Sequence, residues 1–143
     1  GGQGTVLASK LLAAASMAKG LPVMSAETIG MAQKGGSVFS HLRIGAGAKN
    51  PMIRRGTADL LLAFEPAEAV RMLPYLKKDG VLVVNASPIM PVTAALSATN
   101  YTGREMRLCL LLAWRISRRK SARGAGSAFA RLAAQASLLV TAL

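Results

Sequence analysis

The stretch DLLLAFEPAEAVRMLPYLKKDGVLVVN, residues 59–85, determines the fold class of this 143-residue chain. It begins with a continuous apolar run at residues 60–64, which is typical of a strand covered on both faces. A helix is expected at residues 67–76, because Pro66 suits the first helical position. Residues 81–85 repeat the composition of a buried strand. Strand, helix and strand in so few residues form a βαβ unit, which implies parallel pairing and predicts an α/β domain.

The residues before this unit continue the alternation of helices and strands. Residues 5–19 are rich in alanine and leucine, and we expect them to form a helix that ends before Gly20. A short strand follows at Val23 and Met24. Alternating apolar and polar residues predict a further strand at residues 37–44, and residues 45–57 are expected to form a loop. We therefore expect a three-layer, Rossmann-like domain with a mostly parallel sheet.

The formal charge of +12 is unevenly distributed along the chain. Residues 1–103 hold ten basic and five acidic residues, whereas residues 104–143 hold eight basic residues and one acidic residue. From residue 104 on, Arg, Ala, Ser and Leu dominate and no strand pattern is evident. We expect the domain to occupy residues 1–103 and an atypical basic tail, helical or disordered, to occupy residues 104–143. A shifted reading frame in GC-rich coding sequence would also give this tail composition.

Few residues in this chain could ligate a metal or act as a catalytic base. Cys109 is the only cysteine and His41 the only histidine, so this chain alone could not ligate a zinc–thiolate site or an iron–sulfur cluster, and no metal site is expected. His41 falls in a predicted strand and is expected to be structural or exposed. No run approaches the ~20 apolar residues of a membrane span, and the start lacks the pattern of a signal peptide, so the cytosol is the expected location.

A first glycine cluster, Gly1-Gly2-Gln3-Gly4, precedes the predicted N-terminal helix. The N–H groups of Gly2, Gln3, Gly4 and Thr5 could hold a phosphate or a carboxylate at the positive end of the helix. However, GGQG is not the dinucleotide motif GxGxxG, and both the preceding strand and the ribose-binding acid are absent. A nucleotide, another anion, and a structural or subunit-contact turn all remain open as interpretations.

A second glycine-rich stretch, SAETIGMAQKGGSV at residues 25–38, lies between two predicted strands. Polar groups on such a loop are how rigid scaffolds present binding surfaces, and the alternative is a solvated loop. The candidate binding residues in this stretch are Glu27, Thr28, Gly30, Gln33, Lys34, Gly35, Gly36 and Ser37.

Taken together, these motifs resemble the gamma-type domain of the 2-oxoacid:ferredoxin oxidoreductases, the pyruvate/ketoisovalerate oxidoreductase family, and most closely the beta subunits of indolepyruvate ferredoxin oxidoreductases. The resemblance covers residues 1–100. It departs from the family pattern at Ile29, where members have histidine, and at Lys34, where members have arginine. Members usually begin with a short apolar strand before the glycine turn, so the first strand is expected to be missing here. The four segments that carry the resemblance are GGQGTVLASKLLAAAS, SAETIGMAQKGGSVFSHLRIG, NPMIRRGTADLLLAFEPAEAVRMLPYL and DGVLVVNASPIMP.

The resemblance implies a cytoplasmic subunit without cofactors or catalytic residues of its own. Thiamine diphosphate and iron–sulfur clusters would sit on the partner alpha subunit. The complex would decarboxylate an aryl 2-oxoacid, indolepyruvate above all, pass electrons to ferredoxin and form an acyl-coenzyme A. In that setting the two glycine-rich segments would face the partner and shape the approach of coenzyme A, a co-substrate.

Two other functions compete with this hypothesis. The basic tail could bind nucleic acid or an anionic membrane, although aromatic residues for stacking are few. Alternatively, the chain could be a stand-alone Rossmann-like dehydrogenase that uses GGQG for a dinucleotide, although it lacks residues for hydride transfer. We expect neither nucleic acid nor membrane to be a partner.

Overall fold

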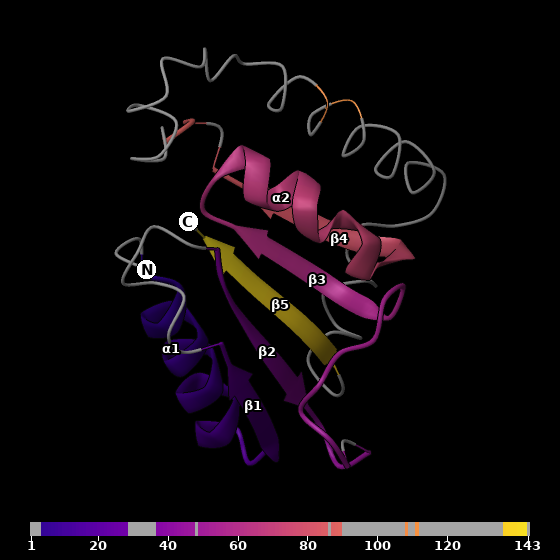
Figure 1. Ribbon diagram of the computed structural model, residues 1–143. Coiled ribbons are helices and arrows are strands. Elements are labelled where there is room, and N and C mark those ends of the chain that lie inside the picture. Colours follow the sequence, from indigo (N-terminus) through magenta and orange to yellow (C-terminus); the bar gives the residue numbers. More distant parts are fainter. Residues whose placement is uncertain are drawn as a thin grey trace.

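The chain contains both helices and strands in the computed structural model (Figure 1). The model describes residues 4–28, 37–47, 49–85, 87–89, 108, 111 and 136–142. The order of the helices and strands is α1 (Thr5–Ala18), β1 (Val23–Glu27), β2 (Val38–Ile44), β3 (Ala58–Ala63), α2 (Pro66–Met72), the 3-10 helix η2 (Leu73–Tyr75), β4 (Leu76–Val84) and β5 (Ala136–Ala142). The α/β fold class predicted from the sequence is confirmed.

All five strands belong to one sheet, in the order β1-β2-β5-β3-β4. β2 is antiparallel to both of its neighbours, β1 and β5. β3 is parallel to both β4 and β5. Therefore β1, β3, β4 and β5 all run in one direction and only β2 opposes them, which confirms a mostly parallel sheet.

A helix covers each face of the sheet, which gives the expected three layers (Figure 1). Successive side chains of a strand point to opposite faces. Accordingly Leu138 packs in the cluster beneath α1, whereas Leu139 packs in the cluster beneath α2. The buried residues beneath α1 are Leu42, Ile44, Ala136 and Leu138, with Leu12 and Ala13 of the helix against them. On the other face, Met72 of α2 packs with the buried residues Leu61, Leu76 and Leu139.

The end of α1 follows the predicted glycine signal. Gly20 has φ 75°, a left-handed conformation that glycine adopts without a steric penalty. Its N–H donates to Met17 O at 2.9 Å, and the N–H of Leu21 donates to Ser16 O at 3.1 Å. These two bonds form a Schellman motif, which satisfies carbonyl groups at the end of the helix and turns the chain into β1.

The helix of the βαβ unit is shorter than expected. Pro66 takes the first helical position, as predicted, and Glu65 caps the helix by accepting from the N–H of Glu68 at 3.0 Å. The α-helix nevertheless ends at Met72, because Pro74 has no N–H to donate and its ring disfavours a continuing helix. The chain instead forms η2, and β4 begins at Leu76, five residues before the predicted start at residue 81.

The expectation that no strand follows residue 104 is wrong for residues 136–142. Ala136–Ala142 forms β5, the central strand, which lies between β2 and β3. Its sequence, ASLLVTA, has the apolar composition of a doubly covered strand, but the surrounding Arg-, Ala- and Ser-rich sequence hid that signal. The predicted boundary between residues 103 and 104 lies outside the described residues and stays a prediction.

Asp59 in β3 connects the two strands that flank it. One carboxylate oxygen pairs with the ammonium of Lys77 at the start of β4. The other accepts from the N–H of Ser137 in β5 at 2.8 Å. A single side chain therefore ties β3 to both neighbours at the amino ends of the parallel strands, and its bond to Ser137 lies where β5 enters the sheet.

Two substitutions of Asp59 should distinguish the contributions of these two contacts to stability. Asp59→Ala leaves the N–H of Ser137 without its acceptor, and the free energy of unfolding should fall by roughly 1–3 kcal/mol. Asp59→Asn keeps an oxygen for that N–H and removes only the ion pair. The Lys77 side chain is 42% exposed, so this loss should stay below about 1 kcal/mol. Urea denaturation of both variants measures the two effects, and equal losses would contradict a role for the Ser137 contact.

Candidate functional site

The carboxyl ends of the parallel strands gather polar residues at one edge of the sheet, which we call the carboxyl edge. Thr28 follows β1, Asn85 follows β4, and Thr141 lies in the last part of β5. β2 runs the other way, so Ser37 precedes its first residue at this same edge. In open α/β sheets, ligands bind outside the carboxyl ends of the strands. This edge is therefore the candidate site.

The amino end of α1 also points to the carboxyl edge and has no side-chain cap. Gly4, at the N-cap position, has φ 90°, and no side chain accepts from the first N–H groups of the helix. Thr5 is only 2% exposed, and its hydroxyl has no hydrogen-bond partner. The anion site predicted at Gly4 and Thr5 stays a prediction. Gly2 and Gln3 of the same prediction lie outside the described residues.

Glu27 is bound to the side of α1 that faces the sheet. The hydroxyl of Ser9, a buried residue of the helix, donates to Glu27 Oε1 at 3.1 Å. Glu27 pairs with Ser40 across β1 and β2, and the fully buried hydroxyl of Ser40 has no partner. A carboxylate near the amino end of a helix is favourable, but it also reduces the attraction of that end for a second anion.

Thr28 joins β1 to β2 at the point where the second glycine-rich stretch leaves the sheet. Its Oγ1 donates to Phe39 O at 2.7 Å and accepts from Phe39 N at 3.1 Å, and its own N–H donates to the same carbonyl. The hydroxyl of Thr28 is therefore occupied by the backbone of β2 and extends the β1–β2 pairing by one residue. The predicted site residues Gly30, Gln33, Lys34, Gly35 and Gly36 lie outside the described residues.

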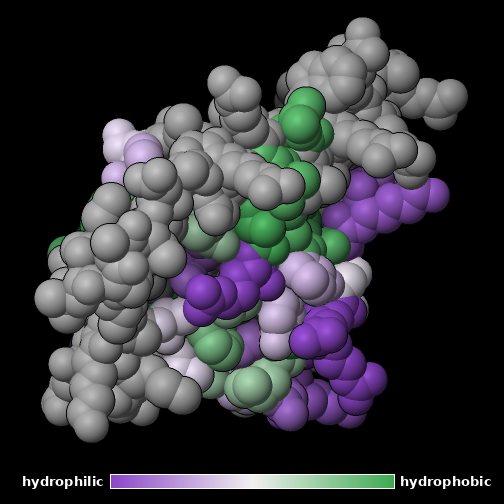
Figure 2. Space-filling model, turned by 45° about the horizontal axis from the view of Figure 1, so that its top comes forward, coloured by the Kyte–Doolittle hydropathy of each residue, from purple (hydrophilic) through white to green (hydrophobic). Residues whose placement is uncertain are grey.

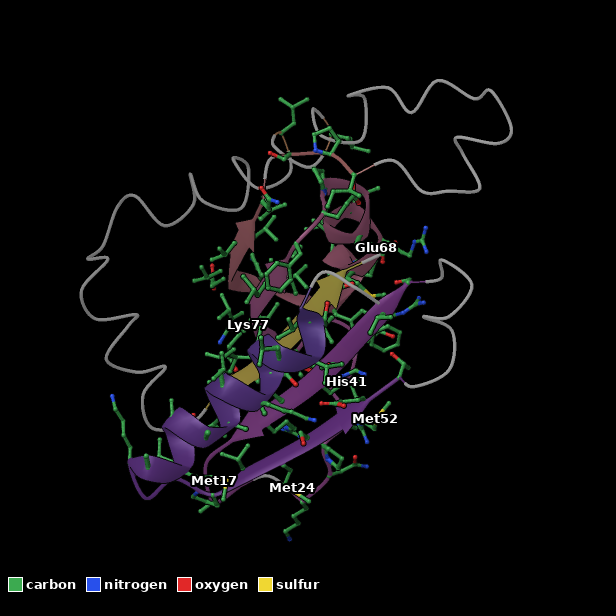
Figure 3. The ribbon with its side chains drawn as sticks, turned by 90° about the vertical axis from the view of Figure 1, so that its left-hand side faces the viewer. Met17, Met24, His41, Met52, Glu68 and Lys77 are labelled. Atoms are coloured by element: carbon green, nitrogen blue, oxygen red, sulfur yellow. The ribbon has the colours of Figure 1, made fainter. Side chains whose placement is uncertain are left out.

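A fully buried carboxylate, Glu68, joins three elements at the carboxyl edge (Figure 3). Glu68 Oε2 accepts from the hydroxyl of Ser37 before β2, and from that of Thr141 in β5 at 3.4 Å. Its Oε1 lies 3.2 Å from the guanidinium of Arg71, an ion pair without a hydrogen bond. Ser37 is thus fixed by α2 and β5, so the end of the glycine-rich stretch has a rigid anchor.

Sequence reasoning found Ser37 but missed the residues that hold it. Glu68 was identifiable only as an acidic residue in the first turn of a helix, a position that usually reflects the helix dipole. Thr141 had no signal, because no strand was expected in residues 104–143. Ser9 and Ser40 gave no signal in the sequence, because each looks like any small residue in a helix or a strand.

His41 lies in β2 and serves packing rather than chemistry. Its Nδ1 accepts from the N–H of Ile53 at 3.2 Å, so the neutral ring carries its proton on Nε2. The ring meets Phe39 and Tyr75 edge to face, with centroids 5.3 and 6.2 Å away. Burial lowers the pKa of His41 below its usual 6.5, because the charged form loses its hydration. The buried position fits the structural alternative predicted for His41, and the exposed alternative is wrong.

Among the described residues, no group of three or more His, Cys, Asp or Glu side chains is arranged to hold a metal ion. In that same part of the chain, no helix is both long and apolar enough to cross a membrane. The candidate site therefore consists of hydroxyls, buried carboxylates and an uncapped helix end.

Comparison with known proteins identifies the relatives of this chain. The family model for pyruvate ferredoxin/flavodoxin oxidoreductase matches residues 1–142. The indolepyruvate oxidoreductase subunit IorB of Archaeoglobus fulgidus is 44% identical over 101 residues, which are 71% of this chain and 50% of that protein. The proteins of the same name from Pyrococcus horikoshii and Thermococcus kodakarensis are 41% and 42% identical, over 73% and 71% of this chain. The chain spans about half the length of these curated relatives.

The buried His41 predicts how stability depends on pH. The pKa of His41 is lower in the folded chain than in the unfolded chain, so the unfolded chain takes up the proton first as pH falls. The free energy of unfolding should therefore be highest above about pH 7. It should fall as the pH drops below about 6.5, the pKa of histidine in the unfolded chain. His41→Asn offers an oxygen to the N–H of Ile53 and does not titrate, so this decline should be smaller. Urea denaturation from pH 5 to 8 measures both proteins, and identical pH profiles would refute the assignment.

Proposed function

The chain belongs to the pyruvate ferredoxin/flavodoxin oxidoreductase family, and we propose that it acts as the non-cofactor subunit of a 2-oxoacid:ferredoxin oxidoreductase specific for indolepyruvate. The observation that carries this proposal is the 41–44% identity to proteins named indolepyruvate oxidoreductase subunit IorB. Because the chain spans about half of their length, the activity of the whole complex is part of the proposal.

In the proposed complex, the partner alpha subunit holds thiamine diphosphate and iron–sulfur clusters. Those groups decarboxylate and oxidise the aryl 2-oxoacid, and the electrons pass to ferredoxin while coenzyme A accepts the acyl group. The described residues of this chain support an auxiliary role, because their buried carboxylates are engaged. Glu68 is paired with hydroxyls and an arginine, and Glu65 caps α2.

The carboxyl edge is the proposed approach for coenzyme A. Gly4 and Thr5 would bind one of its phosphates through the uncapped N–H groups of α1 and the unpaired Thr5 hydroxyl. The glycine-rich stretch between β1 and β2 would face the partner subunit. Its residues with this proposed role are Glu27, Thr28, Gly30, Gln33, Lys34, Gly35, Gly36 and Ser37. The contacts of Thr28 and Ser37 support a role as fixed anchors of that stretch.

No observation favours either competing function. A nucleic-acid or membrane role would depend on residues 104–143, of which the structure describes positions 108, 111 and 136–142. Residues 136–140 are buried in the centre of the sheet, so this part of the tail cannot form a binding face. For a dehydrogenase, β1 does end in an acidic residue, Glu27, where the sequence predicted none, but Ser9 donates a hydrogen bond to its carboxylate.

The proposal is tested by reconstitution with the alpha subunit of an indolepyruvate oxidoreductase. The purified proteins should co-elute, and the complex should reduce ferredoxin or a dye in the presence of indolepyruvate and coenzyme A faster than the alpha subunit alone. Omission of coenzyme A is the control for acyl transfer. Failure to co-elute, or a rate equal to that of the alpha subunit alone, would overturn the proposed function.

The anion-binding role of Thr5 has a separate test in the reconstituted complex. Thr5→Val keeps the shape of the side chain and removes a buried hydroxyl that has no partner, so the chain should remain as stable as before. A hydrogen bond to a charged phosphate would be lost, and the KM for coenzyme A should rise roughly tenfold while the KM for indolepyruvate stays unchanged. Ser16→Ala, at the other end of the same helix, is the matched control. An unchanged KM for coenzyme A in Thr5→Val would exclude this role.

A further inference from the structure

The outer face of α1 is apolar, and large side chains are exposed on it. Leu7, Leu11 and Met17 are 62%, 61% and 64% exposed. Ala14 and Ala18 are exposed as well, and with the two leucines they follow the helical spacing i, i+4, i+7, i+11. Among the 14 residues of α1, Lys10 is the only charged one. We call this stripe, made of Leu7, Leu11, Ala14, Met17 and Ala18, the outer face of α1.

The distribution of residues on α1 differs from that on an ordinary surface helix, because both its inner and its outer side carry apolar residues. An amphipathic helix buries its aliphatic residues and exposes its polar ones. In α1 the buried positions include Thr5 and Ser9, whose hydroxyls face away from solvent, while two leucines lie outside. A helix that is apolar on all sides is normally covered on all sides. The sheet covers only the inner side of α1, so the outer face requires another cover.

In the rest of the described residues, large apolar side chains are exposed in smaller numbers on any one element, at Met52, Val83, Ile89, Leu108 and Leu111. Met52 lies in the loop between β2 and β3, and Val83 lies on the edge strand β4. The face that Figure 2 shows is mixed, with hydrophobic residues directly beside hydrophilic ones. By contrast, Figure 3 looks onto the side that α1 covers and shows the helix in front of the sheet, with Met17 near its lower end. Scattered apolar residues are common on proteins, whereas apolar side chains gathered on one face of a helix, here interrupted by Lys10, mark an interaction site.

We propose that the outer face of α1 is the surface on which the alpha subunit of the oxidoreductase docks; this rests on the proposed function. The relatives of this chain are named as subunits, so a partner chain is available to cover the helix. Leu7 lies in the first turn of α1, and the amino end of this helix lies at the carboxyl edge. A partner bound to Leu7 and Leu11 would therefore lie beside the candidate site.

A charge placed on this face tests the proposal. The variant Leu7→Glu with Leu11→Glu should still fold, since both positions are exposed and glutamate has a high helix propensity. Circular dichroism and the thermal midpoint of the isolated chain check this. Binding to the purified alpha subunit, measured by titration calorimetry, should weaken more than tenfold. The matched control, Met52→Glu with Val83→Glu, adds the same charge at similarly exposed apolar positions, 52% and 48% exposed, and should change Kd less than twofold.

The outcomes separate the docking surface from the proposed function. If the wild-type chain binds the alpha subunit and the α1 variant binds equally well, the docking surface is refuted and the proposed function stands. If the wild-type chain does not bind, the proposed function fails and the docking surface fails with it. If light scattering shows a dimer of the wild-type chain that the α1 variant loses, a second copy covers the helix, which refutes docking of the alpha subunit there.

Discussion

The sheet depends on the backbone pairing of one strand, β5. Without Ala136–Ala142, β1 and β2 would form one antiparallel pair and β3 and β4 a separate parallel pair, because every link between the two passes through β5. An isolated pair of strands is marginally stable in water. The strand also supplies both cores, with Leu138 beneath α1 and Leu139 beneath α2. Its two ends are held by side chains of other elements, Asp59 at Ser137 and Glu68 at Thr141.

The sequence predicted the parts of the fold whose signals are local. Gly20 ends α1 and Pro66 begins α2, because each acts on the backbone beside it. The strand that completes the sheet was missed because its partners are distant: the bond from Ser137 to Asp59 spans 78 residues. The end of the βαβ helix was also misjudged, since Pro74 outweighed the helical pattern of its neighbours.

The candidate site shows the same division between local and distant signals. Gly4, Thr5, Glu27, Thr28 and Ser37 were identifiable from composition and spacing, and all lie at the carboxyl edge. Composition did not reveal that Thr28 is bound to the backbone of β2, or that Ser37 is bound to a buried carboxylate. Most polar groups of this edge therefore serve to position backbone, and the unpaired hydroxyls of Thr5 and Ser40 are the exceptions.

Because β5 is central in the sheet but late in the sequence, the sheet can be completed only late in biosynthesis. Chains emerge at ~5–20 residues per second and begin to fold during synthesis. The ribosome must make all residues from β4 to β5 before β2 and β3 can meet their shared neighbour. Throughout that interval, both strands present unpaired N–H and C=O groups, which can pair with strands of other nascent chains. For several seconds of synthesis, β2 and β3 are therefore exposed to pairing with strands of other polypeptides.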